Sequence, residues 1–147
     1  MKLTIHHDRE LTETEIIINC SGVDPRINEL IRYIRQYSFS LSLMDSEKRF
    51  HQIPLEQVYY IESVDGKTYV YDEKDVYQSK ETLQALEDSL VHTPFVRISK
   101  SCLLNTTCLK YVKPIVNHRL EGTLKNNEKV IIARTYILAL QEKLQNM

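Results

Sequence analysis

The sequence predicts a mostly β domain with a few peripheral helices, an α+β fold, and three observations support this prediction. From residue 39 onward, apolar and polar residues alternate in short runs, as in strands with one buried face. Turn-forming residues separate these runs, and the Asp65-Gly66 pair between two of them predicts a hairpin. Apolar residues recur at helical spacing in three segments. With 147 residues, the chain has the length of one medium-sized domain with a short appendage.

The first 38 residues are predicted to form a β-β-α unit of their own. Two short strands are expected, at residues 3–7 and 15–20. Asp24 then offers a carboxylate as a helix N-cap, Pro25 suits the first helical position, and a helix of about three turns follows. We predict that residues 1–38 are a dimerisation or partner-binding element, with extra packing as the alternative, and that residues 39–147 form the second domain.

Short strands are predicted to make up most of this second domain. The expected strands are residues 39–43, 49–53, 58–62, 67–72, 95–105, 108–116, 118–124 and 129–133. Helices are expected after Ser79 and after Thr135, because each of these hydroxyl residues can serve as an N-cap before an apolar helical stripe.

The stretch at residues 95–105 is predicted to be a buried strand with a polar break. Apolar residues alternate with, or surround, side chains that donate hydrogen bonds, and this combination suits the binding of an anion. The alternative is a half-buried strand with solvated charges. Its polar residues are Arg97, Ser99, Lys100, Ser101 and Asn105.

The net charge of −1 conceals an uneven distribution of charge along the sequence. Residues 51–94 contain three basic and nine acidic side chains, whereas residues 95–147 contain nine basic and three acidic ones. A basic third of this kind indicates a surface that binds a polyanion. The alternative is that the acidic and basic parts bind each other or a partner chain.

Motifs of catalysis, cofactor binding or metal binding are absent from the sequence. It contains no phosphate-binding glycine loop, nucleophile elbow or HExxH motif, and the adjacent His6 and His7 would point to opposite faces of a strand. The cysteines at 20, 102 and 108 have no CxxC spacing, so we expect reduced, buried thiols, with a redox pair of Cys102 and Cys108 as the alternative. The sequence shows no signal peptide and no long apolar run, which predicts a cytoplasmic chain without a membrane span.

Three motifs resemble those of the LytTR family of bacterial DNA-binding domains. They are IPLEQVYYIES at 53–63, FVRISKSCLLN at 95–105 and GTLKNNEKVIIARTYILALQEKL at 122–144. Their order and spacing match those of the family, and the resemblance extends from about residue 39 to residue 144. It implies an elongated β-sheet domain whose loops, rather than a recognition helix, enter successive major grooves of duplex DNA. It also implies a transcriptional regulator that is not an enzyme.

The resemblance assigns DNA contacts by position. It assigns them to Lys67 or Thr68 after the first hairpin, to Ser99 and Lys100, and to Arg134 before the last helix. A guanidinium fork matches the acceptors of guanine, so Arg134 is expected to read a base, with an ion pair to Glu62 or Glu121 as the alternative. The other predicted DNA-binding residues are Arg97, Asn105, Lys113 and Arg119. For Arg97 the alternative is a structural role, an ion pair with an acidic side chain.

Double-stranded DNA is the expected partner, bound by two copies on a repeated site, because pairing multiplies the limited specificity of one domain. Thirty-eight residues are too few for a receiver domain, so we expect a stand-alone regulator with an unknown regulatory partner. RNA is less favoured, because the tyrosines available for stacking bases are concentrated in the acidic middle of the sequence. The alternative function is a non-catalytic protein-interaction module with an acidic and a basic face.

Overall fold

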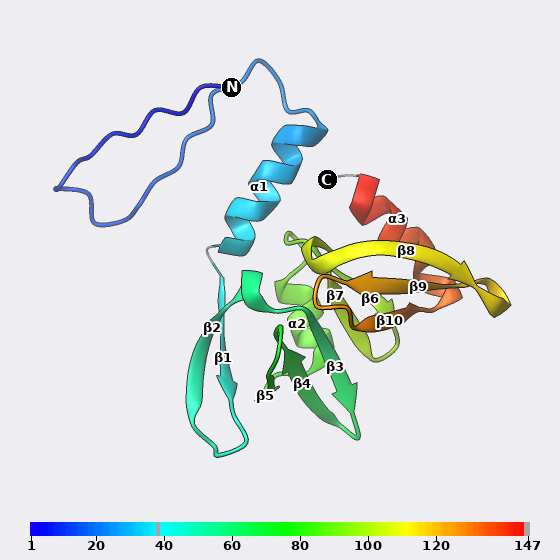
Figure 1. The fold of residues 1–147 in the computed structure, drawn as a ribbon. Helices are drawn as coiled ribbons and strands as arrows, with labels where there is room; N and C mark the ends of the chain where they lie inside the picture. Colours follow the sequence, from blue (N-terminus) through cyan, green and yellow to red (C-terminus); the bar gives the residue numbers. More distant parts are fainter. Residues whose placement is uncertain (38, 146–147) are drawn as a thin grey trace.

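The structure, a computed structural model, describes residues 1–37 and 39–145, and in this part of the chain ten strands form two antiparallel sheets (Figure 1). The larger sheet has seven strands in the order β2-β1-β5-β4-β3-β7-β6, and the smaller has three in the order β10-β9-β8. Helices lie at the periphery of the sheets (Figure 1). The predicted mostly β fold with peripheral helices is confirmed.

The strands are β1 (Ser40–Met44), β2 (Phe50–Pro54), β3 (Tyr60–Val64), β4 (Lys67–Tyr71), β5 (Val76–Ser79), β6 (Phe95–Ser99), β7 (Cys102–Asn105), β8 (Leu109–Ile115), β9 (Arg119–Leu124) and β10 (Lys129–Ile132). The helices are α1 (Pro25–Tyr37), α2 (Leu83–Ser89) and α3 (Ile137–Gln145). Short 3-10 turns lie between them, and these are η1 (Leu55–Gln57), η2 (Thr106–Cys108), η3 (Val116–His118) and η4 (Arg134–Tyr136).

Strands β3 and β4 form the hairpin that the Asp65-Gly66 pair predicts. They pair along their full length, ending with Val64 opposite Lys67. Asp65 and Gly66 have φ angles of 51° and 77°. Two consecutive positive φ angles are what a two-residue type I′ turn requires, and aspartate and glycine adopt them at low cost.

Two hydrophobic cores stabilise the domain, and the β6–β7 hairpin contributes to both. One core lies between the large sheet and α2 and contains Phe95 of β6 and Leu103 of β7. The other joins the small sheet and α3 to the hairpin and contains Ile98 and Leu104. A hairpin buried on both faces needs apolar residues at consecutive positions, which explains the adjacent Leu103 and Leu104. The stretch predicted as one strand with a polar break is therefore a tight hairpin that turns at Lys100 and Ser101.

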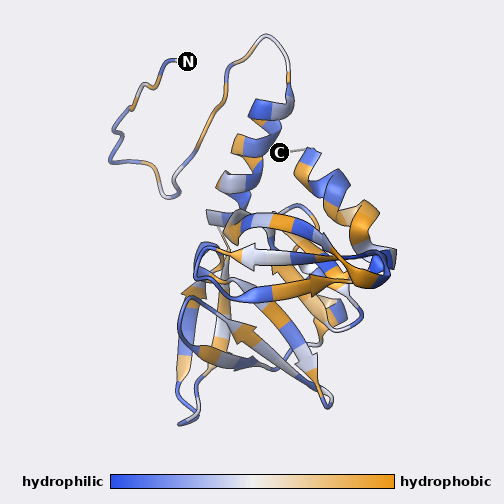
Figure 2. Cartoon of the chain, turned by 45° about the vertical axis from the view of Figure 1, so that its right-hand side comes forward, coloured by the Kyte–Doolittle hydropathy of each residue, from blue (hydrophilic) through white to orange (hydrophobic). Residues whose placement is uncertain are grey.

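The N-terminal region contains the predicted helix but not the two predicted strands. Asp24 caps α1 as expected, because its Oδ1 accepts a hydrogen bond from the Ile27 amide at 3.0 Å. Residues 1–24, all of them described, have turns and irregular backbone, so the strands predicted at 3–7 and 15–20 are wrong. A hairpin without further strands or a core is marginal in water, and Figure 2 shows this segment standing away from the sheets. Its exposed apolar side chains are Leu3, Ile5, Leu11, Ile16, Ile17 and Val23.

The predicted domain boundaries were residues 38 and 147. Both of these positions lie outside the described residues.

Both predicted N-caps in the second domain need correction. Ser79 ends β5, a strand that was not predicted, and pairs with Thr68 of β4. The N-cap of α2 is Thr82, whose Oγ1 accepts a hydrogen bond from the Ala85 amide at 3.1 Å. Thr135 lies inside η4, so the chain enters α3 from a 3-10 turn. Ser79 and Thr135 both match the cap pattern, a hydroxyl residue before an apolar stripe. In the structure, however, Ser79 belongs to a paired strand and Thr135 to a 3-10 turn.

The three cysteines are free thiols in different surroundings. Cys20 is exposed, contrary to the prediction of buried thiols, because the strand expected around it does not form. Cys108 is buried, and its thiol donates a hydrogen bond to the Val58 carbonyl at 3.7 Å. Burial, with a further contribution from the Glu62 carboxylate, raises the pKa of Cys102 from its ordinary 9.0 to about 12, and burial also raises the pKa of Cys108.

We expect a thiol-specific aromatic disulfide reagent to label only the exposed Cys20 of the native chain at about pH 8, and all three cysteines in urea. The thiolate is the reactive form, and the raised pKa keeps Cys102 and Cys108 protonated at this pH. The raised pKa of Cys102 also predicts that the free energy of unfolding falls as the pH rises above 9.0 toward 12. The reason is that this thiol ionises at a lower pH in the unfolded chain than in the folded chain. Rapid double labelling of the native chain, or a disulfide between Cys102 and Cys108 after mild oxidation, would contradict this expectation.

No helix among residues 1–37 and 39–145 is both long and apolar enough to cross a membrane. In the same residues, His, Cys, Asp and Glu side chains form no group of three or more that would hold a metal ion.

Candidate nucleic-acid interface

Two turns of the large sheet lie side by side at one end of it. The β3–β4 turn presents Lys67, and the β6–β7 turn presents Lys100. Strand β3 pairs with β7, and the Ser63 amide donates a hydrogen bond to the Ser101 carbonyl at 2.8 Å next to both turns. Both lysines are exposed, so the pairing of these strands places two ammonium groups on one end of the sheet.

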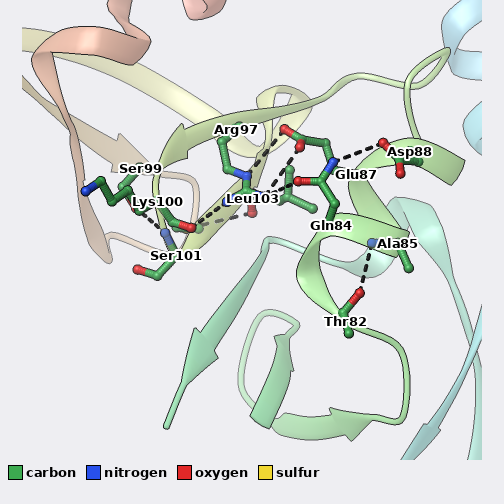
Figure 3. A network of polar contacts seen from close by, with 11 residues as sticks. Thr82, Gln84, Ala85, Glu87, Asp88, Arg97, Ser99, Lys100, Ser101 and Leu103 are labelled. Carbon is green, nitrogen blue, oxygen red and sulfur yellow. Dashed lines mark hydrogen bonds and ion pairs between the residues drawn. The ribbon is translucent and has the colours of Figure 1, made fainter. Parts of the chain in front are cut away.

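The β6–β7 turn is held by side chains of its own hairpin and of α2 (Figure 3). The Ser99 hydroxyl accepts a hydrogen bond from the Ser101 amide at 3.3 Å, and the Arg97 guanidinium donates to the Lys100 carbonyl. Arg97 Nε also forms an ion pair with Glu87 Oε2 at 3.3 Å. Only 15% of the Arg97 side chain is exposed. The structure thus supports the alternative for Arg97, a structural ion pair with Glu87, while a hydrogen bond of the same guanidinium fixes the backbone at Lys100.

Arg134 follows β10 and lies next to the same turn. The Ala133 amide donates a hydrogen bond to the Ile98 carbonyl at 2.9 Å, which places Arg134 beside the last residues of β6. Arg134 is exposed, and within the described part of the chain it forms no ion pair with Glu62 or Glu121. Glu121 lies instead within 3.7 Å of Lys113 Nζ and 3.6 Å of Lys129 Nζ. The guanidinium is therefore available at the surface.

Arg119 lies at the tip of the small sheet, at the same end of the domain. Strand β9 pairs with β10 with Leu120 opposite Ile132, so the residues after Ile132 run alongside the β8–β9 turn. Asn117 and His118 have φ angles of 64° and 56°, which gives this turn its tight shape. Arg119 Nε donates a hydrogen bond to a carbonyl of the turn at 3.3 Å, and its side chain is half-buried.

We call these four turns, residues 64–67, 99–101, 115–119 and 133–134, the loop edge. Its basic residues are Lys67, Lys100, Arg119 and Arg134, and its single acidic residue is Asp65. Most acidic residues of the middle of the sequence lie elsewhere, in the β4–β5 turn and around α2. Folding therefore concentrates positive charge at one end of a nearly neutral chain.

Two predicted DNA contacts are buried, and the structure corrects them. Thr68 is 5% exposed inside the large sheet. Asn105 is 0% exposed; its Nδ2 donates to the Val58 carbonyl at 2.8 Å, and its Oδ1 accepts from the Thr107 amide at 3.1 Å. A side chain with this burial and these partners cannot reach a DNA surface. Lys113 is exposed near Glu121, two positions before the β8–β9 turn, and its contact with DNA stays a prediction.

The loop edge includes three uncharged polar residues that the predicted site left out, Ser101, Asn117 and His118. All three lie in turns next to predicted contacts, at Lys100 and Arg119. Their position between two strands was the signal available in the sequence.

A family model of the LytTr DNA-binding domain matches residues 48–145. The match includes the chain from β2 to α3 and all four turns of the loop edge. The family consists of DNA-binding domains rather than enzymes, in agreement with the non-catalytic role predicted from the sequence.

The curated relatives are bacterial regulators. The sequence is 28% identical over 101 residues to the sensory transduction protein LytT of Enterococcus faecalis, covering 69% of this chain and 42% of that protein. It is 26% identical over 101 residues to the transcriptional regulatory protein LytR of Staphylococcus aureus, covering 68% and 41%. The match thus spans about two-fifths of the length of these relatives.

A solved LytTr DNA-binding domain from Bacillus cereus has a similar fold. Its TM-score is 0.67 at 25% identity, over 73% of this chain and 98% of that chain.

Proposed function

Because the chain belongs to the LytTr DNA-binding domain family, we propose that it is a transcriptional regulator that binds duplex DNA through the loop edge. This proposal is supported by the four turns of the loop edge, which come from both sheets and contain four basic residues and one acidic residue. DNA affinity depends mainly on cations placed along the phosphate backbone, and the loop edge has such a row. In bacteria, binding to a promoter would occur in the cytoplasm.

The turns are proposed to enter successive major grooves, with different tasks for different side chains. A major groove about 12 Å wide admits a two-stranded β-ribbon, so a hairpin tip such as the β3–β4 turn fits it. Arg134 is the proposed base reader, because its guanidinium is exposed and unpaired among the described residues. Lys67, Lys100 and Arg119 are the proposed phosphate contacts.

Two copies are proposed to bind one repeated site. A single loop edge presents few side chains to base edges, and a second domain multiplies specificity through effective concentration. The region 1–38 is the proposed dimerisation or partner-binding element, because its apolar side chains lie outside both cores of the domain.

Selection of bound duplexes from a random library tests this proposal. We expect a repeated motif with half-sites about one helical turn apart, and an affinity that falls steeply with salt. Four cations per copy predict a log–log slope of about −3 to −4 for one copy and about twice that for two. If no sequence is enriched and no salt-dependent binding to DNA is found, the proposed DNA-binding function is wrong. The protein-interaction module would then explain the two charged faces.

A charge variant connects this result to the loop edge. Replacing Lys67 and Lys100 by glutamine should reduce the magnitude of the salt slope by about 2 for each copy. The matched control replaces Lys2 and Lys74, which are exposed outside the loop edge, and should leave the slope unchanged.

A further inference from the structure

A cavity of about 310 Å³ lies between helix α1 and the β domain. Tyr33, Gln36 and Tyr37 line it from α1, while Glu56 of η1 and Tyr59 line it from the domain. This volume is at the lower end of the range for small-molecule sites, and its lining combines aromatic faces with a few polar groups, as such sites do.

Two polar side chains that line this cavity have buried atoms without partners among the described residues. Gln36 is 1% exposed, yet neither its Oε1 nor its Nε2 has a hydrogen-bond partner among the described residues. The Oε2 atom of Glu56 is likewise buried and unpartnered in the described chain. Buried polar atoms without partners cost folding free energy, so a glutamine at the packed side of α1 is unfavourable unless something else pairs with it.

We propose that this cavity binds a small amino-substituted aromatic heterocycle, with adenine as the type ligand. The amide of glutamine matches the exocyclic amine and adjacent ring nitrogen of adenine, accepting one hydrogen bond and donating the other. The Glu56 carboxylate accepts a further N–H of the ligand. Tyr33, Tyr37 and Tyr59 offer flat faces on which a planar ring stacks.

The cavity and the loop edge lie at opposite ends of the same strands. Tyr59 precedes β3, whose far end leads to Lys67. Another lining residue, Thr107, follows β7, which begins just after Lys100. A ligand in the cavity therefore leaves the loop edge open while it joins α1 to the domain. Ligand binding therefore acts on α1 and, through α1, on residues 1–24, which precede this helix.

Calorimetric titration of the full chain, without DNA, tests the site. The probes are adenine and unsubstituted purine, which has the same ring system but no exocyclic amine. We expect saturable 1:1 binding of adenine, at least about tenfold tighter than that of purine. Gln36→Met keeps the side-chain volume and should abolish the preference for adenine, whereas the exposed Gln57→Met on η1 should keep it.

Three outcomes would overturn the proposal. These are no heat from adenine up to about 5 mM, equal affinity for both probes, and an unchanged adenine preference in Gln36→Met. Thermal unfolding of the ligand-free protein shows that the variant is folded, and removal of an unpartnered amide should raise its Tm. Glu56→Gln supplies an independent variant, for which we expect at least about tenfold weaker adenine binding. Because DNA is absent, failure here says nothing against binding of DNA at the loop edge.

Discussion

Replacing Arg134 by alanine is expected to weaken binding to the selected DNA site by about 1–3 kcal/mol, which is roughly 5- to 150-fold in affinity. Arg134 is exposed beside the β6–β7 turn and forms no ion pair within the described residues, so its fork is available for guanine O6 and N7. The preference at one base pair of the site should relax, while non-specific binding falls only by the effect of one charge. Fluorescence anisotropy with the selected duplex and with single-base variants measures both effects.

Arg134→Lys separates base reading from charge. Lysine keeps the positive charge but lacks the planar fork, so it should restore the salt slope and not the full base preference. Arg26→Ala removes an exposed arginine from α1, outside the loop edge, and should change neither quantity. If Arg134→Ala bound the best site as tightly as the parent, the assignment of this residue as a base reader would be wrong.

Replacing Asn105 by alanine is expected to destabilise the fold by about 2–4 kcal/mol, a large share of the 5–15 kcal/mol typical of a domain. The Asn105 side chain ties the end of β7 to the Val58 carbonyl and caps η2 through the Thr107 amide. Alanine leaves these buried groups without their partner. Urea unfolding followed by circular dichroism measures the loss, and Asn28→Ala on the exposed face of α1 is the matched control.

The same variant also tests the corrected role of Asn105. Under conditions in which it is folded, Asn105→Ala should bind the selected DNA as the parent does, because this side chain is fully buried. A folded variant with weaker DNA binding would return Asn105 to the interface. A destabilisation below about 1 kcal/mol would mean that water replaces the amide.

Local chemistry made much of the framework predictable. The Asp65-Gly66 pair specifies its own backbone angles, and the alternation of apolar residues places most strands within a few positions of the observed ones. The two N-terminal strands failed because strand propensity requires a partner strand, and nothing in a local pattern says whether one exists. Strand β5 was missed between two turns, where only its pairing with β4 identifies it.

The site was less predictable than the framework, because a polar residue has two possible environments. Asn105 and Lys100 are both polar residues of the same motif, yet one is fully buried with its hydrogen bonds made and the other is exposed in a turn. Arg97 of β6 is a further example, because its side chain forms an ion pair with Glu87 of α2. These partners are distant in sequence, so spacing alone does not separate a supporting side chain from a DNA contact.

The burial of the β6–β7 hairpin in both cores has a consequence for the rigidity of its turn. Opening either sheet would expose residues that the other core also needs, so we expect the hairpin to unfold together with the whole domain. The amides that pair β6 with β7 are therefore expected to be among the slowest to exchange with solvent. The turn at Lys100 therefore meets its partner already ordered, and little conformational entropy is left to lose when it binds.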